Sequence, residues 1–389
     1  MSILVKKIVI DGQSETLESI FRFLDNVEYI DNIPEHDSFW FELAFYGNGI
    51  ENFWEHVESN FKTQELIPYL KSKQAKLAIC YMREYPFAHN SWVQMQSKIG
   101  KDACNKFDID PKQIYYFYGN KPTELESFKQ TDINVIDIPY FEIDFVHRVN
   151  QGEIEYISPY EAERKNPSRT FLDMNGKPNK YMRLRHVVHM WNKRIIDHGI
   201  INLYQTDEDR RIWETEDYRN LVIDLINDKD WEKFLKWWPQ SHDSNEGLYG
   251  KHHCGYPYDR KLFEDTFMSV VAETHSGARD CNSQFFISEK IVKAIGNCHP
   301  FVILSTPDYL KELQKLGYKT FSPYFNESYD SEKDAELRMI KAVDEVERIC
   351  KNGVPIKTLE TAIHNQSLLF ERYNATLKKL KEIITWQLF

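Results

Sequence analysis

The sequence predicts an α/β protein of two Rossmann-like domains that face a cleft and are followed by C-terminal helices. Three observations support this fold class. The chain has 389 residues, more than one hydrophobic core usually organises. Apolar strand-like runs alternate with helical patterns in both halves, which is typical of βαβ units around a parallel sheet. A polar, irregular stretch at about 141–168 separates the halves and suits a linker.

The first half contains a series of strand-like runs. The run at 6–12 is followed by apolar residues at helical spacing between Leu17 and Leu24. The run at 39–48 is also strand-like, but its mixed apolar pattern leaves its place in the sheet open. We expect residues 1–150 to form an N-terminal Rossmann-like domain. Further strand-like runs are 76–82, 114–120 and 134–140.

A second alternating series follows the predicted linker. A helix expected at 183–197 lies between strand-like runs at 170–175 and 200–205. We expect residues 165–351 to form a C-terminal Rossmann-like domain, and residues 352–389 to form a helix that packs back across the domains. Further strand-like runs are 267–274, 299–305 and 318–321, and helical patterns span about 331–351 and 356 to the end.

The composition excludes several classes of protein. Apolar residues make up 42% of the chain and charged residues 28%, as in soluble globular proteins. The formal net charge of -11 disfavours nonspecific coating of nucleic acid or anionic membranes, although a local basic groove remains open. The first residues are typical of a strand rather than a signal peptide, and we expect no membrane span. The six scattered cysteines indicate a reducing compartment, so we expect a cytoplasmic protein.

Histidines and cysteines do not follow the spacing of a standard tetrahedral zinc site, and we expect neither a metal nor a cofactor. The relevant residues are His252, His253, Cys254, His275, Cys281, Cys298 and His299.

A Ser-Glu-Lys segment stands where a strand-like run ends and a helical piece begins. The Ser288 hydroxyl can cap the first turn of that helix. Glu289 can accept hydrogen bonds from ribose hydroxyls, while Lys290 and the free amides of the helix favour phosphate oxygens. The alternative is a simple helix cap followed by a solvated acid and base, and spacing alone leaves both open.

This segment, FFISEK with the following HPFVILSTP, resembles the Thr-Glu-Lys region of α-1,3-fucosyltransferases and related GT-B glycosyltransferases, with Ser in place of Thr. The resemblance implies that Glu289 and Lys290 contact a nucleotide sugar. The upstream run FMSVVAET is similar to that family's strand ending in Phe-Glu-Asn-Ser, which places Glu273 on the donor side. The resemblance also implies a GT-B fold and transfer with inversion.

A wider resemblance is to uncharacterised glycosyltransferase-like proteins of phages and marine bacteria. It covers roughly 170–350 and includes FLDMNGKPNKYMRLRHVVHMWNKRIIDHG and PDYLKELQKLGYKTFSPYFNESYD. Asn175, Lys177 and Arg183 stand at matching places, whereas Gly176 stands where that group usually has Arg. The resemblance therefore implies that Lys177 and Arg183 neutralise the diphosphate of the donor.

The helix after the 170–175 run offers two arginines for the same role. Arg183 and Arg185 present forks of N–H donors that suit a pyrophosphate. The alternative is a solvated helix face, because Val187 and Val188 define the expected buried side. Tyr329 is a further candidate contact to a base or ribose.

Sugar transfer needs a group that deprotonates the acceptor hydroxyl, and the N-terminal domain should supply it. Glu84 follows a strand-like run, with His89 near it, and we expect it to be the catalytic base. Asp11 and Asp37 are rivals. The alternative, which the sequence supports at least as well, is that Glu84 is a loop carboxylate in an ion pair.

These features predict a metal-independent, inverting glycosyltransferase that uses a UDP- or GDP-sugar. The acceptor is either a glycan or a hydroxymethylated pyrimidine in phage DNA, in which case the protein would act in the host cytoplasm and need a basic groove. The alternative is a noncatalytic nucleotide-sugar-binding module. Candidate groove residues are Lys177, Lys180, Arg183, Arg185, Lys193 and Arg194.

Overall fold

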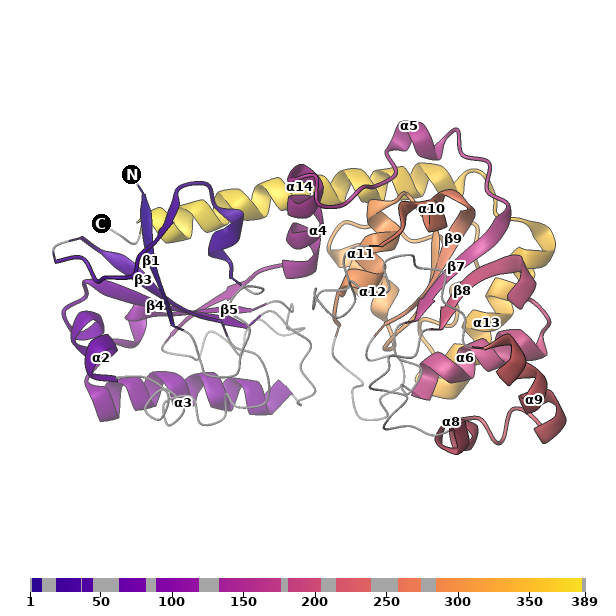
Figure 1. Ribbon diagram of the computed structural model, residues 1–389, viewed down its shortest axis with the longest axis horizontal. Helices are drawn as coiled ribbons and strands as arrows, with labels where there is room; N and C mark the ends of the chain where they lie inside the picture. Colours follow the sequence, from indigo (N-terminus) through magenta and orange to yellow (C-terminus); the bar gives the residue numbers. More distant parts are fainter. Residues whose placement is uncertain are drawn as a thin grey trace. The chain divides into compact units, whose positions relative to one another are not determined.

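The computed structural model describes residues 2–8, 19–35, 37–44, 63–81, 89–118, 133–175, 181–203, 215–238, 258–273 and 285–386. These residues form two compact units. The first is Met1–Ile143 with Arg372–Phe389, and the second is Asp144–Glu371. Each unit contains one parallel β-sheet with helices (Figure 1), so the predicted α/β class with two Rossmann-like sheets is confirmed.

The first unit holds a six-stranded sheet in the order β2-β1-β3-β4-β5-β6, in which neighbouring strands are parallel. The uncertain run at 39–48 supplies a central strand, because β3 pairs with both β1 and β4. The strands are β1 (Ile3–Ile8), β2 (Val27–Tyr29), β3 (Phe39–Ala44), β4 (Ala75–Tyr81), β5 (Ile114–Tyr118) and β6 (Asn134–Asp137).

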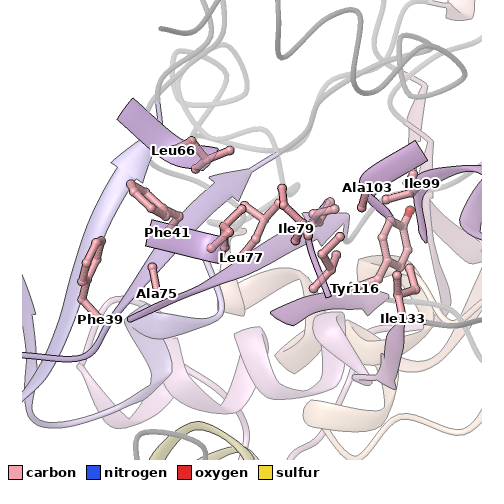
Figure 2. Packing of buried hydrophobic residues seen from close by; sticks show 13 residues of the cluster. Phe39, Phe41, Leu66, Ala75, Leu77, Ile79, Ile99, Ala103, Tyr116 and Ile133 are labelled. Atoms are coloured by element: carbon pink, nitrogen blue, oxygen red, sulfur yellow. The ribbon is translucent and has the colours of Figure 1, made fainter. Parts of the chain in front are cut away.

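The strands of this sheet are apolar on both faces, as parallel strands covered on both sides require. One face packs against α2 (Thr63–Lys71) and α3 (His89–Phe107), and its buried cluster includes Phe41, Leu77 and Tyr116 (Figure 2). On the opposite face the Trp40 ring lies 5.9 Å from the Phe21 ring and 5.0 Å from the Tyr115 ring.

The second unit holds a four-stranded parallel sheet in the order β10-β9-β7-β8. Its strands are β7 (Arg169–Asn175), β8 (Gly199–Leu203), β9 (Thr266–Ala272) and β10 (Phe301–Leu304). The chain passes from β7 to β8 on one side and later from β9 to β10 on the other. The order therefore reverses between β7 and β9, and ligands of such sheets bind at this switch point, beyond the carboxyl ends of the strands.

The helices of this sheet lie on both faces (Figure 1). The crossover from β7 to β8 uses α6 (Tyr181–Asn192), and that from β9 to β10 uses α11 (Glu289–Gly296). Because the two crossovers run in opposite directions along the sheet, right-handed connections place these helices on opposite faces. The helix α13 (Ala335–Asn352) contacts α6 and β10, and α10 (Arg260–Glu264) contacts β9.

Two sequence expectations about local structure are wrong. The expected linker contains α4 (Tyr140–Asn150), whose Ile143, Phe145 and Val146 are fully buried. The expected strand at 318–321 is irregular, because its N–H groups bond to side chains: Lys319 N–H to Asn365 Oδ1 at 2.8 Å and Phe321 N–H to Glu327 Oε1 at 2.7 Å.

The remaining described elements are short, apart from the last helix. No helix among the described residues has both the length and the apolar character that crossing a membrane requires. The described helices not yet named are η1 (Phe21–Phe23), η3 (Pro111–Gln113), α5 (Pro159–Ala162), η5 (Ile196–His198), α8 (Thr215–Leu221), α9 (Asp228–Trp237), α12 (Tyr309–Lys315) and the long last helix α14 (Thr358–Trp386).

Candidate functional site

Polar side chains gather where the second sheet reverses its strand order. Asn175 is the last residue of β7, and Glu273 follows the last residue of β9 directly. The helices α6 and α11 begin after these two strands. Because carboxyl ends of parallel strands share one edge of a sheet, the topology places these groups around one corner of the second unit.

Ser288 caps α11, as the sequence predicts, and is also bonded to Glu273. Its hydroxyl oxygen accepts the Lys290 N–H at 3.2 Å. The same hydroxyl donates to Glu273 Oε2 at 2.6 Å, and the Ser288 N–H points to Oε1 at 3.4 Å. Glu273 is 2% exposed and Ser288 is fully buried. The hydrogen bond between Ser288 and Glu273 therefore holds the N-terminus of α11 beside the end of β9.

Glu289 and Lys290 remain near the surface. Lys290 Nζ donates to Glu289 Oε1 at 2.8 Å and lies 3.3 Å from Ser288 Oγ. Burial raises the pKa of Glu289, but the positive charges of Lys290 and Lys293 outweigh it, so the pKa is lowered overall. The segment thus presents an ionised acceptor beside a cationic donor, as binding of a ribose and a phosphate requires.

Arg183 lies in the first turn of α6 and is only 6% exposed. The alternative of a solvated helix face is therefore wrong at this position. Among the described residues Arg183 has no hydrogen-bond or ion-pair partner, although a buried charge without a partner costs free energy. His186, three residues later, bonds to Asp173 of β7 at 2.8 Å. Because residues three apart share a helix face, Arg183 lies on the side of α6 that faces the sheet.

Arg185 has the opposite environment. It is 3% exposed, and Asp224 and Glu336 bind its guanidinium at distances of 2.6–3.1 Å. A further N–H donates to the Leu221 carbonyl at 2.9 Å. Burial alone would lower the pKa of Arg185, but the hydrogen bonds to both carboxylates raise it overall. This network links α6 to α13 and occupies the N–H groups of the guanidinium, so none remains for a phosphate. Arg185 is therefore not part of the candidate site.

A buried cluster of Asp173, Asn175 and His186 lies beneath the first turn of α6. Asn175 Nδ2 donates to Asp173 Oδ1 at 2.6 Å and lies 3.4 Å from His186 Nε2. His186 Nδ1 is 2.9 Å from the Met182 carbonyl. Sequence reasoning named only Asn175. The available signal was two polar residues at alternate positions of an apolar strand, which places both on one face.

Tyr329, the predicted contact to a base or ribose, is buried in the core of the second unit. It is 1% exposed, and its hydroxyl oxygen accepts the Ile303 N–H at 3.4 Å. Burial raises the pKa of Tyr329 well above its usual value. Its environment is that of a core residue beneath β10.

Several predicted residues lie outside the described part of the chain: Asp11, Glu84, Gly176, Lys177, Lys180, His252, His253, Cys254, His275 and Cys281. His89 begins α3, but its side chain is not described. Asp37 is exposed, and Lys193 is paired with Asp344 at 2.7 Å and Glu347 at 2.8 Å. No group of three metal-ligating side chains occurs among the residues for which positions are given.

The first unit contains a buried carboxyl group that sequence reasoning missed. Glu42 of β3 is 2% exposed, and its Oε2 has no hydrogen-bond partner among the residues that the structure describes. Cys80 Sγ lies 3.8 Å from its Oε1. Burial raises the pKa of Glu42 to about 7, although Ser19, Lys7 and Cys80 oppose this. The polar residue interrupts an apolar strand pattern, which was the only sequence signal.

No protein-family model matches the chain, and no curated protein matches it. A solved structure that is similar is a crystal structure of the DNA-modifying enzyme β-glucosyltransferase, studied with and without its substrate uridine diphosphoglucose. The match has 9% sequence identity and a TM-score of 0.41, and covers 98% of this chain and all of that chain (100%). A likeness this remote carries no argument about function.

Proposed function

We propose that the protein is a glycosyltransferase that transfers a sugar from a nucleotide-sugar donor to an acceptor hydroxyl. The observation that carries this proposal is Arg183. Arg183 is 6% exposed as a whole residue, has no partner among the described residues and lies in the first turn of the helix after β7, so its guanidinium is suited to a diphosphate. Its place beside the strand-order reversal agrees with this role.

The donor would be bound by groups from both helices. Arg183, Lys177 and Lys290 neutralise the diphosphate, and their positive charges serve the leaving group without a metal ion. Glu289 accepts hydrogen bonds from ribose hydroxyls, while Glu273 and Ser288 hold the start of α11 in place. A UDP- or GDP-sugar carries the required diphosphate and hydroxyls.

Transfer would proceed with inversion. A carboxylate of the N-terminal domain, for which Glu84 is our candidate, takes the proton of the acceptor hydroxyl. The acceptor oxygen forms a bond to the anomeric carbon as the bond from that carbon to the diphosphate oxygen breaks. The nucleoside diphosphate leaves with the bonding electrons, and Arg183 and Lys290 stabilise its charge. The acceptor is a glycan or a hydroxymethylated pyrimidine in DNA, and the reaction would take place in the cytoplasm.

A thermal-shift screen against nucleoside diphosphates and sugar nucleotides tests donor binding, because a ligand of the native state raises the unfolding midpoint. We expect a selective shift by one diphosphate. Incubation of that sugar nucleotide with glycan acceptors and with hydroxymethylated DNA should then release the nucleoside diphosphate. Binding without turnover on either acceptor would favour the noncatalytic nucleotide-sugar-binding module, and no shift from any ligand would contradict both functions.

A further inference from the structure

The cluster of Asp173, Asn175 and His186 leaves one hydrogen-bonding atom unused. Asn175 Oδ1 is buried and has no partner in the described part of the chain, while the Nδ2 of the same amide donates to Asp173 Oδ1 at 2.6 Å. Asn175 is 1% exposed, and both Asp173 and His186 are fully buried. A buried acceptor without a partner costs free energy, and native proteins contain few of them.

The protons of this cluster fix the orientation of the amide. The Met182 carbonyl can only accept, so His186 Nδ1, 2.9 Å away, carries a hydrogen. One more proton lies between His186 Nε2 and Asp173 Oδ2, which are 2.8 Å apart. Whichever of these two atoms holds it, Asp173 Oδ1 remains an acceptor. Asn175 must therefore turn its NH₂ group toward Asp173 and its carbonyl oxygen away.

The unused acceptor lies in the same corner as an unused donor. Asn175 ends β7 at the strand-order reversal, and Arg183 lies on the sheet-facing side of α6, three residues before His186. A ligand that satisfies both must combine an anionic group for Arg183 with an O–H or N–H donor for Asn175. Phosphate oxygens supply the anionic group and a sugar hydroxyl supplies the neutral O–H donor, so a sugar joined to a diphosphate offers both.

We propose that Asn175 is a specificity-determining residue that accepts a hydrogen bond from a sugar hydroxyl of the donor, and that Asp173 and His186 are its positioning residues. This inference rests on the proposed nucleotide-sugar site. The hydroxyl belongs either to the ribose or to the transferred sugar. Because Oδ1 is enclosed in the unliganded protein, the hydroxyl must displace the atoms that cover it.

Removing the hydroxyl from the ligand and the acceptor from the protein, singly and together, tests this assignment. Calorimetric titration would compare UDP and GDP with their 2′-deoxy and 3′-deoxy analogues, and the sugar nucleotides with analogues lacking one sugar hydroxyl. For one analogue we expect about a tenfold loss of affinity in the wild type, roughly the value of one hydrogen bond. In Asn175→Ala that loss should vanish. If the loss appears with a deoxy analogue of the free nucleoside diphosphate, the bound hydroxyl belongs to the ribose. If it appears only with an analogue of the sugar nucleotide, the bound hydroxyl belongs to the transferred sugar.

Asn202→Ala is the matched control. Asn202 of β8 also has a buried carbonyl oxygen without a partner, but it pairs in register with Met174 and so lies on the opposite face of the sheet from Asn175. This variant should discriminate between the ligands as the wild type does. Unchanged discrimination in Asn175→Ala overturns the inference alone, whereas no binding of any nucleotide to the wild type overturns the proposed function and the inference with it.

The positioning role has its own readout. In Asp173→Asn, the carboxamide oxygen can still accept from Asn175 and its NH₂ can donate to a neutral His186, so discrimination should be retained. In Asp173→Leu it should be lost, as in Asn175→Ala. Retention in a folded Asp173→Leu protein contradicts positioning by Asp173. If Asp173→Leu does not fold, Asp173→Asn provides the test, once its circular dichroism spectrum is shown to match that of the wild type. Loss of discrimination in Asp173→Asn would then contradict positioning by Asp173.

Discussion

Ser288 donates a 2.6 Å hydrogen bond to Glu273, and both side chains are buried at the carboxyl edge of the second sheet. The two residues are 15 positions apart and belong to different elements, the end of β9 and the cap of α11. The contact therefore joins Glu273 to the Ser-Glu-Lys segment, both of which belong to the predicted donor site, and Ser288 does more than cap its own helix.

Replacement of Ser288 by alanine should lower the free energy of unfolding by about 1–3 kcal/mol, because it removes a cap and a partner of a buried carboxylate. Urea denaturation measures this change. Ser288→Thr keeps the hydroxyl but adds a methyl group at a buried position, so we expect it to lose less stability than Ser288→Ala rather than none. Equal losses in both variants would mean that the hydroxyl contributes nothing and that only the packing changed.

Replacement of Glu289 by glutamine should change the affinities for two ligands in opposite directions. It removes the ionised acceptor for ribose hydroxyls, so nucleoside diphosphates should bind about tenfold more weakly. It also releases Lys290 from its 2.8 Å ion pair, so inorganic diphosphate should bind more tightly, by about 0.2–1 kcal/mol. Titration calorimetry with both ligands measures the two effects. Weaker binding of both would contradict the separate roles of Glu289 and Lys290.

Leucine substitutions at Arg183 and Arg185 should separate binding from stability. Arg183→Leu removes a buried charge without a described partner, so we expect unchanged or higher stability and a loss of diphosphate binding. Arg185→Leu breaks the network with Asp224 and Glu336 and should cost about 1–3 kcal/mol of unfolding free energy. Thermal unfolding and titration of both variants with the same diphosphate provide the comparison.

Each arginine serves as the control for the other, since both lie in the first half of α6 and both are buried. A diphosphate that binds Arg183→Leu as tightly as the wild type would remove the observation on which the proposed function depends.

Two buried glutamates, Glu42 and Glu327, should each lower the stability of the protein as pH rises from about 4.5 to 7. Burial raises the pKa of Glu42 to about 7 and the pKa of Glu327 to about 7, whereas an unfolded glutamate titrates near 4.3. Between these values the folded state binds more protons than the unfolded state, so each rise in pH favours unfolding. Glu42 alone should account for a loss on the order of 3 kcal/mol across this window.

Glu42→Gln isolates this contribution. Near pH 4 the carboxyl group of Glu42 is protonated in the folded state, so variant and wild type should have similar stability. Their difference should grow in favour of the variant up to about pH 7. Denaturant unfolding at several pH values measures the two curves, and parallel curves would show that Glu42 does not titrate differently in the folded protein.

Hydrophobic periodicity predicted most of the alternating strands and helices of both sheets, because it records which faces are buried. It missed β2 (Val27–Tyr29), and the described part of the helix expected between Leu17 and Leu24 contains only η1 (Phe21–Phe23). It failed at 141–168, where polar residues interleave with the buried Ile143, Phe145 and Val146 of α4. It also failed at 318–321, where the backbone N–H groups of Lys319 and the buried Phe321 donate to the side chains of Asn365 and Glu327. Apolar character reports burial, but it does not report which groups satisfy the backbone.

The sequence by itself determined the α/β class and the local cap at Ser288, since both depend on residues close together in the chain. It could not distinguish Arg183 from Arg185, which have the same side chain two positions apart on one helix. Only the tertiary structure decided between them, because Asp224 and Glu336 lie 39 and 151 positions from Arg185. The fold brings these carboxylates to Arg185 and leaves Arg183 buried without a described partner. A residue's partners depend on distant segments, and periodicity carries no record of them.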